Sequence, residues 1–442
     1  MDASNLVKTE PKSRPIGRIE KMVRVADEAY TMSFGTSALV EGPTDPATVR
    51  RALDRLAERH PLLRAAVDGD RFVLGEAAPI ELVETSAPLE ETDAILEASI
   101  QHQRWDARGP RARCFVVRHG EGLATIALAF DHLVSDGGSG VIALRDLLAR
   151  IGGEPVSDEP IGSPGQEHFL PPGRGGTRDL FRSLAHIGEQ GKKPKPFRLG
   201  KGPRVAPFER RTRIHRIRLG RDESEAVARF AKASGATVHG VLVGALALAH
   251  AELAGRDGSV PLRVMHPVDM RRYLASVTGE DRIGDAIGYY VSSVETDHLV
   301  STESALSSLA GEVTQAVRTA KERGEPFLSA PAAGRLLVLA RSLLGAERFR
   351  DVGERQVLVG SLGLTNLGAL ERLGMRARFG SLRVRSVGFI ASPSVFGAFC
   401  GSASSFDGSI ELVLHHVEPR MDADTARRLA EMVERILRDL EP

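Results

Sequence analysis

Apolar side chains recur along the first third of the chain with two different periods, and each period predicts its own kind of element. In residues 47–60 they return every three to four positions after Asp45 and Pro46, which predicts a surface helix with an aspartate cap and a proline in its first turn. Short strands are expected at 62–67 and 71–74, and apolar runs at 113–118 and 123–130, separated by HGEG, predict a β-hairpin. Residues 139–151 have helical spacing, so the hairpin should lead into a helix.

The second half of the chain repeats this mixture of strands and helices. Strands are predicted at 213–219, 261–272 (running into a turn), 287–295, 355–364, 381–390 and 409–417, and helices at 222–234, 238–253, 304–322, 330–344 and 422–440. Glycine and proline are frequent between 152 and 210, which is typical of a connection. We therefore expect an α/β protein with mixed sheets, in which an N-terminal lobe over 1–175 is joined through 176–210 to a C-terminal lobe over 211–442.

Length, charge and cysteine content narrow the class of protein. At 442 residues the chain is longer than a single hydrophobic core usually supports, which agrees with two lobes. A net charge of +1 at pH 7 gives no overall reason to expect nucleic acid or a membrane surface as a partner. Two cysteines fit a reducing compartment, and no apolar run is long enough to cross a bilayer. We expect a cytoplasmic monomer without a membrane span.

The stretch AFDHLVSDGGSG, residues 129–140, offers chemistry at the predicted change from strand to helix. A neutral imidazole such as that of His132 can remove a proton near pH 7, because its ordinary pKa is about 6.5. Asp136 lies too close in sequence to orient this ring across a tight turn, and we expect an arginine elsewhere to hold it. Gly137 and Gly138 would allow substrate or backbone to approach closely. The chain contains no G-x-S-x-G elbow, Walker A sequence or H-E-x-x-H motif, which argues against serine-hydrolase, nucleotide-driven and zinc-hydrolase chemistry.

Residues 130–137, FDHLVSDG, resemble the HHxxxDG motif of the condensation-domain superfamily, which includes nonribosomal peptide condensation domains and polyketide-associated acyltransferases. Further segments match in the same order: RPIGRIE at 14–20, RHPLLR at 59–64, PVDMR at 267–271, IGYYV at 287–291 and TNLG at 365–368. Several ordered segments are far more specific than one hexapeptide.

The resemblance implies two chloramphenicol-acetyltransferase-like lobes in a V, with His132 midway along a tunnel between them. An acyl thioester, on coenzyme A or on the phosphopantetheine of an acyl or peptidyl carrier protein, would meet an alcohol or amine acceptor in natural-product or lipid biosynthesis. His132 would act as general base, and no cofactor would stay bound.

The resemblance also assigns roles to the other motif residues. The catalytic motif includes Asp136 and Gly137, and Asp136 would form a structural salt bridge with Arg271 of the second lobe. The expected substrate-binding residues are Asp131, Ser135, Gly138, Thr365 and Asn366, of which Thr365 or Asn366 would bind the developing oxyanion.

One departure from the motif leaves alternatives open, because Asp131 stands where the first histidine is usual. Asp131, Asp136 and Ser139 together make the D-x-x-x-x-D-x-x-S pattern of heterocyclisation domains. If Asp131 points toward the imidazole it would favour the protonated ring, and if it points to the other face of the strand it would satisfy backbone donors. A non-catalytic protein that binds carrier-linked intermediates is a further alternative.

Twelve basic residues between 192 and 221 form either a solvated surface or a docking patch for an acidic carrier protein or coenzyme A phosphates.

Overall fold

The computed structural model divides the chain into two compact units that are not continuous in sequence. It describes residues 12–29, 32–75, 77–101, 105–203, 205–206, 209–255, 258–271, 273, 284–328, 334–352, 360–391 and 398–440. The first unit comprises residues 1–174, 269–291 and 369–391, and the second comprises 175–268, 292–368 and 392–442. The division expected from the sequence, with each lobe continuous, misses the two later segments that pack with the first unit. Arg271 lies in one of them, so it belongs to the first unit and not to the second.

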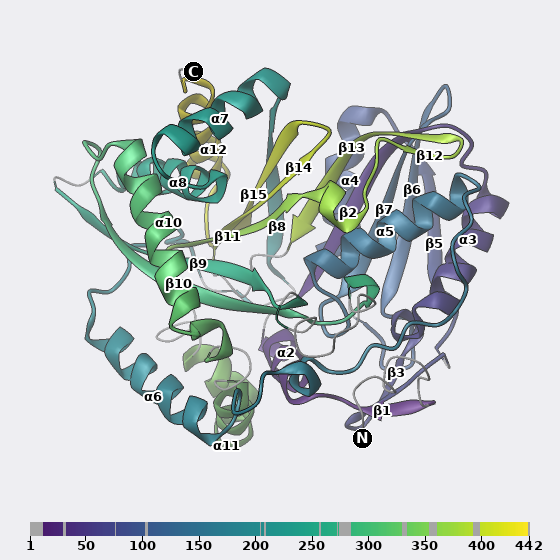
Figure 1. Cartoon of the computed structure of the whole chain (residues 1–442), viewed down its shortest axis with the longest axis horizontal. Helices are drawn as coiled ribbons and strands as arrows, with labels where there is room; N and C mark the ends of the chain where they lie inside the picture. Colours follow the sequence, from purple (N-terminus) through teal and green to yellow (C-terminus); the bar gives the residue numbers. More distant parts are fainter. Residues whose placement is uncertain are drawn as a thin grey trace. The chain divides into compact units, whose positions relative to one another are not determined.

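The first unit is built on a six-stranded mixed sheet in the order β12-β13-β2-β7-β6-β5. Its strands are β2 (Ser33–Glu41), β5 (Glu81–Ser86), β6 (Ala112–Gly120), β7 (Leu123–Asp131), β12 (Arg378–Phe379) and β13 (Leu382–Ala391). All neighbouring pairs are antiparallel except β5 with β6. In Figure 1 the yellow-green β13 therefore lies beside the purple β2, although some 340 residues separate them.

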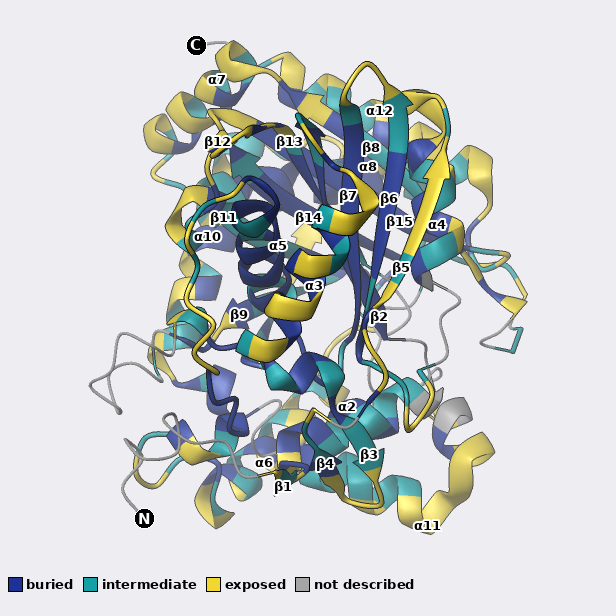
Figure 2. Ribbon diagram, turned by 90° about the vertical axis from the view of Figure 1, so that its right-hand side faces the viewer, coloured by how far each residue is buried: buried dark blue, intermediate teal, exposed yellow. Residues whose placement is uncertain are grey.

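Helices cover both faces of this sheet. The helices of the first unit are α2 (Arg18–Ala29), α3 (Pro46–Arg59), α4 (Thr92–Gln101) and α5 (Gly137–Ile151), and a small sheet is formed by β1 (Ser13–Pro15), β3 (Ala66–Asp68) and β4 (Arg71–Val73). A Cβ atom on Gly140 of α5 would lie 2.9 Å from both Phe34 and Thr36, whereas one on Gly35 would lie 2.5 Å from Ile100 of α4. Because successive side chains of a strand point to opposite faces, α5 and α4 lie on opposite sides of β2. Figure 2 shows α5 almost entirely buried.

The second unit has its own six-stranded mixed sheet, in the order β10-β9-β11-β14-β15-β8. Its strands are β8 (Arg211–Leu219), β9 (Val260–Asp269), β10 (Val291–Val300), β11 (Leu362–Ala369), β14 (Phe399–Phe406) and β15 (Ser409–Glu418), and its helices are α6 (Thr177–Lys192), α7 (Arg221–Ala233), α8 (Val238–Ala254), α10 (Leu306–Glu322), α11 (Gly334–Val352) and α12 (Ala423–Arg438). The expected α/β class with mixed sheets is confirmed.

Most predicted elements are present, with local differences that have physical causes. Asp45 caps α3 by accepting a hydrogen bond from Thr48 N (3.0 Å), and Thr237 caps α8 in the same way. The strand predicted at 62–67 is instead a 3₁₀ turn over Pro61–Arg64 followed by β3. The strand predicted at 287–295 begins only at Val291, because the backbone before it bonds to side chains of the first unit. The prediction at 355–359 lies outside the described residues.

No single helix in the described part of the chain has the length and apolar composition needed to span a membrane. Among the described helices, only the pair α7 and α8 has the required length and apolar composition when taken together, and the two helices are bent by 96° at their junction.

Candidate active site

The turn between β7 and α5 presents a single imidazole in a fixed tautomer. His132 follows the last residue of β7, and its backbone N–H donates to Met32 O (3.1 Å), which keeps the chain beside β2. The ring Nδ1 lies 2.7 Å from Ser135 O. A carbonyl oxygen only accepts hydrogen bonds, so Nδ1 carries the proton and Nε2 keeps its lone pair. None of the described residues forms a hydrogen bond with Nε2.

Aromatic rings and burial keep this imidazole neutral. The ring centroid of His132 lies 5.0 Å from that of Phe34 and 5.2 Å from that of Tyr289, and the residue is half-buried. Burial lowers the pKa of His132 below its ordinary value, and the Ser135 carbonyl and the carboxylates of Asp136 and Asp131 oppose that shift. A neutral ring with an accessible Nε2 can accept a proton at neutral pH.

The carboxylate of Asp136 is saturated with hydrogen bonds. Its Oδ1 accepts from Ser139 N (2.8 Å), which caps α5, and from Arg271 Nη2 (3.0 Å). Its Oδ2 accepts from Arg271 Nη1 (3.0 Å) and from Tyr290 N (2.8 Å). Asp136 and Arg271 are 2% and 6% exposed. Although burial opposes ionisation, Arg271 and these hydrogen bonds hold the pKa of Asp136 below its usual value. Asp136 therefore joins the start of α5 to the segment 269–291.

Two small residues at the start of α5 make room for this junction. Ser139 Oγ donates to Gly288 O (2.8 Å) and accepts from Gly288 N (3.0 Å) and Arg271 Nη2 (2.6 Å). A Cβ atom on Gly138 would lie 2.9 Å from Arg271 Nη1. Gly138 is thus needed for the close approach of the arginine, and no bulkier residue fits without displacing it.

Comparisons with known proteins agree with this fold. A family model described as the phthiocerol/phthiodiolone dimycocerosyl transferase C-terminus matches residues 209–404. Chondramide synthase from Chondromyces crocatus is 26% identical over 259 residues, and the match covers 52% of this chain and 6% of that protein. Trichothecene 15-O-acetyltransferase TRI3 from Fusarium sporotrichioides has a TM-score of 0.71 at 15% identity, with 99% of each chain covered. Polyketide synthase associated protein 5 from Mycobacterium tuberculosis has a TM-score of 0.65 at 16% identity, with 96% of this chain and 97% of that one covered. These likenesses show that this chain has the fold of these acyltransferase and polyketide-associated structures, and that residues 209–404 resemble the dimycocerosyl transferase family in sequence.

The position at which this chain departs from the HHxxxDG motif is occupied by a buried ion pair. Asp131 Oδ2 accepts from Arg111 Nη1 (3.1 Å), and Asp131 Oδ1 accepts from Leu133 N (2.9 Å). Burial raises the pKa of Asp131, while Arg111 and the Leu133 N–H oppose the shift. Asp131 is 4% exposed, and each of its oxygens accepts a hydrogen bond from a neighbouring group of the first unit, so the contacts give this side chain a positional role.

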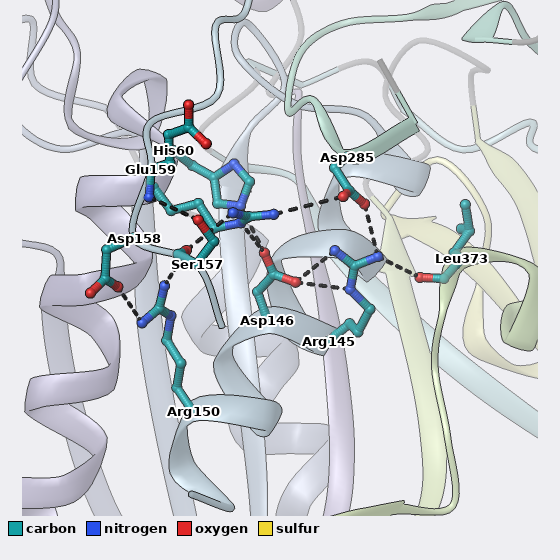
Figure 3. A network of polar contacts seen from close by, with 10 residues as sticks. His60, Arg145, Asp146, Arg150, Ser157, Asp158, Glu159, Asp285 and Leu373 are labelled. Carbon is teal, nitrogen blue, oxygen red and sulfur yellow. Dashed lines mark hydrogen bonds and ion pairs between the residues drawn. The ribbon is translucent and has the colours of Figure 1, made fainter. Parts of the chain in front are cut away.

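The segment RHPLLR, residues 59–64, contributes to a separate polar network, shown in Figure 3, which the sequence motif alone does not indicate. Asp146 Oδ2 accepts from Arg59 Nε and lies 3.0 Å from His60 Nε2, and Asp146 Oδ1 accepts from Arg145 Nε (2.8 Å). Arg145 Nη1 also donates to Asp285 Oδ1 (3.0 Å) and to a backbone carbonyl in the segment 369–391. The network ties α3 and α5 to both later segments of the first unit. A sequence signal was present, because Arg145 and Asp146 are adjacent charges in a largely apolar helix whose only other charged residue is Arg150.

The remaining predicted residues divide between the two units. Ser135 is fully buried and uses its carbonyl to hold the imidazole, and Gly137 is the first residue of α5. Thr365 and Asn366 lie on β11 of the second unit. Asn366 Oδ1 accepts a hydrogen bond from Gly368 N (2.8 Å), which fixes the orientation of the side-chain amide. The amide nitrogen is the hydrogen-bond donor of this side chain. Within the described residues, no three His, Cys, Asp or Glu side chains are arranged to hold a metal ion.

Proposed function

We propose that this chain transfers an acyl group from a thioester, of coenzyme A or of a carrier-protein phosphopantetheine, to a hydroxyl or amine acceptor. The observation that carries the proposal is the tautomer of His132. Its Nδ1–H is committed to Ser135 O at 2.7 Å, so the lone pair of Nε2 is available for the acceptor's proton. A base placed in this way contributes about 10² to 10⁴ in rate.

In the proposed reaction, the acceptor oxygen or nitrogen attacks the thioester carbonyl while Nε2 of His132 takes its proton. The new C–O or C–N bond forms, the C–S bond breaks, and the proton passes from Nε2 to the leaving thiolate. The products are an ester or amide and a free thiol, and no acyl-enzyme forms. The imidazolium that exists between these steps is favoured by its bond to the Ser135 carbonyl and by the carboxylates of Asp136 and Asp131. We assign the oxyanion contact to the Asn366 amide nitrogen or to Thr365.

Ordinary acyl transfer fits the contacts better than the heterocyclisation alternative, which would give chemistry to Asp131 and Asp136. Four hydrogen bonds already saturate the carboxylate of Asp136, and Arg111 and Leu133 N use both oxygens of Asp131. Both carboxylates are buried and hold the turn in place, whereas His132 is half-buried and its Nε2 has no hydrogen-bond partner among the described residues.

The test offers acyl-coenzyme A and carrier-bound thioesters to the full chain with a panel of alcohols and amines. We expect His132→Ala to lower turnover by at least about 10² without changing thermal stability by more than the control does. His168→Ala is the matched control, because His168 also places Nδ1 near the carbonyl three residues away (Gly165 O, 3.1 Å) but lies exposed. Transfer that survives in His132→Ala would remove the proposed base. Binding of carrier-linked intermediates without any transfer by the wild type would favour the non-catalytic alternative.

A further inference from the structure

Exposed apolar side chains are concentrated on two helices of the second unit. Ten large apolar side chains are exposed in the described part of the chain, and seven of them lie on α6 and α11. They are Phe181, Leu184, Ile187, Leu339, Leu343, Leu344 and Val352, which we call the apolar helix surface. Scattered single residues of this kind are normal, but a concentration on adjoining elements indicates an interaction site.

Helix α6 is amphipathic in the reverse of the usual sense. Its buried residues are polar: Asp179 is 1% exposed and accepts from Gly175 N (2.9 Å), and Ser183 is 2% exposed and donates to Leu328 O (2.7 Å). Its apolar residues face outward, with Phe181 67% exposed and Leu184 46% exposed. Hydrogen bonds thus attach this helix to the unit, while the face that a globular protein normally buries remains uncovered.

Helix α11 exposes apolar side chains along its length. Leu343 is 76% exposed and Leu339 is 56% exposed, and Figure 2 shows the exposed colour mainly in the second half of the helix. Phe349 is its only large side chain that is buried among the residues the structure describes. Arg335 near the start of α11 donates to Gly175 O (3.0 Å), just before α6, so the N-terminal ends of the two helices are held together.

Positive charge accompanies the apolar helix surface. Residues 177–198 and 334–352 together contain ten basic and four acidic side chains, whereas the whole chain has a net charge of only +1. The two segments, the first of which runs six residues past the end of α6, therefore carry a net +6, although Lys193 is paired with Asp297 of β10 (2.6 Å). A concentration of lysine and arginine beside protruding phenylalanine and leucine is typical of helices that lie in the interface of a bilayer with anionic lipids.

We propose that α6 and α11 dock this chain on the surface of a membrane that contains anionic lipids. The apolar side chains enter the boundary between headgroups and acyl chains, and the basic side chains contact lipid phosphates. A bilayer suits this surface better than a protein partner does. The apolar side chains protrude from two helices, and a fluid lipid interface can accept them, whereas a protein partner would need pockets that match each side chain. The docking is peripheral and uses residues of the second unit.

The experiment is flotation of the full chain with phosphatidylcholine vesicles, prepared with and without phosphatidylglycerol. We expect binding only with the anionic lipid, and we expect it to weaken as salt is raised. Phe181→Ser and Leu184→Ser should each lower the partition coefficient by about ten-fold, as expected for losing a partly exposed apolar side chain from the interface. Lys195→Glu should lower it several-fold.

Leu299→Ser is the matched control, because Leu299 is also 67% exposed but lies on β10. We expect this variant to bind like the wild type, and all variants should keep the wild-type thermal melting temperature. Wild-type protein that floats with neither vesicle, or a Phe181→Ser/Leu184→Ser variant that floats normally, would overturn the proposal. So would a dimer that the same double substitution dissociates, or binding to an acidic carrier protein in place of vesicles.

Discussion

Replacing Asp136 by asparagine tests how much the first unit depends on one carboxylate. The substitution keeps the shape of the side chain but removes the countercharge of Arg271, and the amide has one acceptor oxygen where the carboxylate has two. Two of the four donors now bonded to Asp136 therefore lose their acceptor. Breaking a buried pair in this way costs about 3–5 kcal/mol. Arg271 keeps weaker contacts with Asp269 Oδ1 (3.4 Å) and Ser139 Oγ, so we expect the lower end, about 3 kcal/mol.

Urea unfolding at pH 7 measures this cost, with Asp424→Asn as the control. Asp424 pairs with Arg427 at 2.6 Å, but both are more than half exposed, so its substitution should cost less than about 1 kcal/mol. The pKa of Asp136 is lowered in the folded protein, so its contribution is present above the ordinary carboxyl pKa and is lost as the pH falls through the lowered value. The difference between wild type and Asp136→Asn should therefore narrow in acid. A cost at pH 7 no larger than that of the control would refute the structural role of the bridge.

Three further substitutions or conditions follow from the same geometry. Because burial lowers the pKa of His132, kcat/KM should rise with pH through a pKa below the ordinary histidine value and stay level to pH 8; a midpoint above 6.5 in a pH–rate profile would contradict this. Gly138→Ala should destabilise the protein by about 1–3 kcal/mol in urea unfolding, because its Cβ atom would lie 2.9 Å from the guanidinium of Arg271. The control is Gly188→Ala on α6, where a Cβ atom would have no neighbour within 4 Å and the substitution should be neutral or stabilising. Asp131→Asn should lower the free energy of unfolding at pH 7 by less than Asp136→Asn does, because burial raises the pKa of Asp131 and its ionised form is stabilised less. Equal losses in parallel urea unfolding curves would show that the two carboxylates are equivalent.

The regular elements could be predicted wherever their apolar positions followed a simple period, as in α3, α5 and α12. The strand β14, with the sequence FCGSASSF, could not, because it is made mostly of small residues with low strand propensity. Tertiary packing explains why small residues occur in this strand. β14 lies between β11 and β15, and a Cβ atom on Gly401 would come within 2.9 Å of Leu364. Small residues there serve close packing, which local sequence does not reveal.

The candidate site was predictable as far as its motif residues, and less so for the backbone around them. Ile287–Tyr290 has the alternation of a strand, but Gly288 and Tyr290 donate their N–H groups to Ser139 and Asp136 in place of a neighbouring strand. These hydrogen bonds join residues that are about 150 positions apart in the sequence, so no local pattern could indicate them. For the same reason the continuous lobe division failed, since nothing local shows that 269–291 and 369–391 pack with residues from the first third of the chain.

Asp131 at the first motif position is compatible with the proposed role of His132, because the two side chains point to opposite sides of the backbone. Phe130 stacks on Phe34 (5.2 Å), and both rings lie under α5; the ring of His132, two residues on, also packs against Phe34. Asp131, between them, points the other way to Arg111. Arg111 also donates to three backbone carbonyls, of Ala65, Asp106 and Ala107, so it is positioned independently of residue 131. The residue at 131 therefore acts on the turn that carries His132, through Leu133 N, while the tautomer of the imidazole is set separately by Ser135 O.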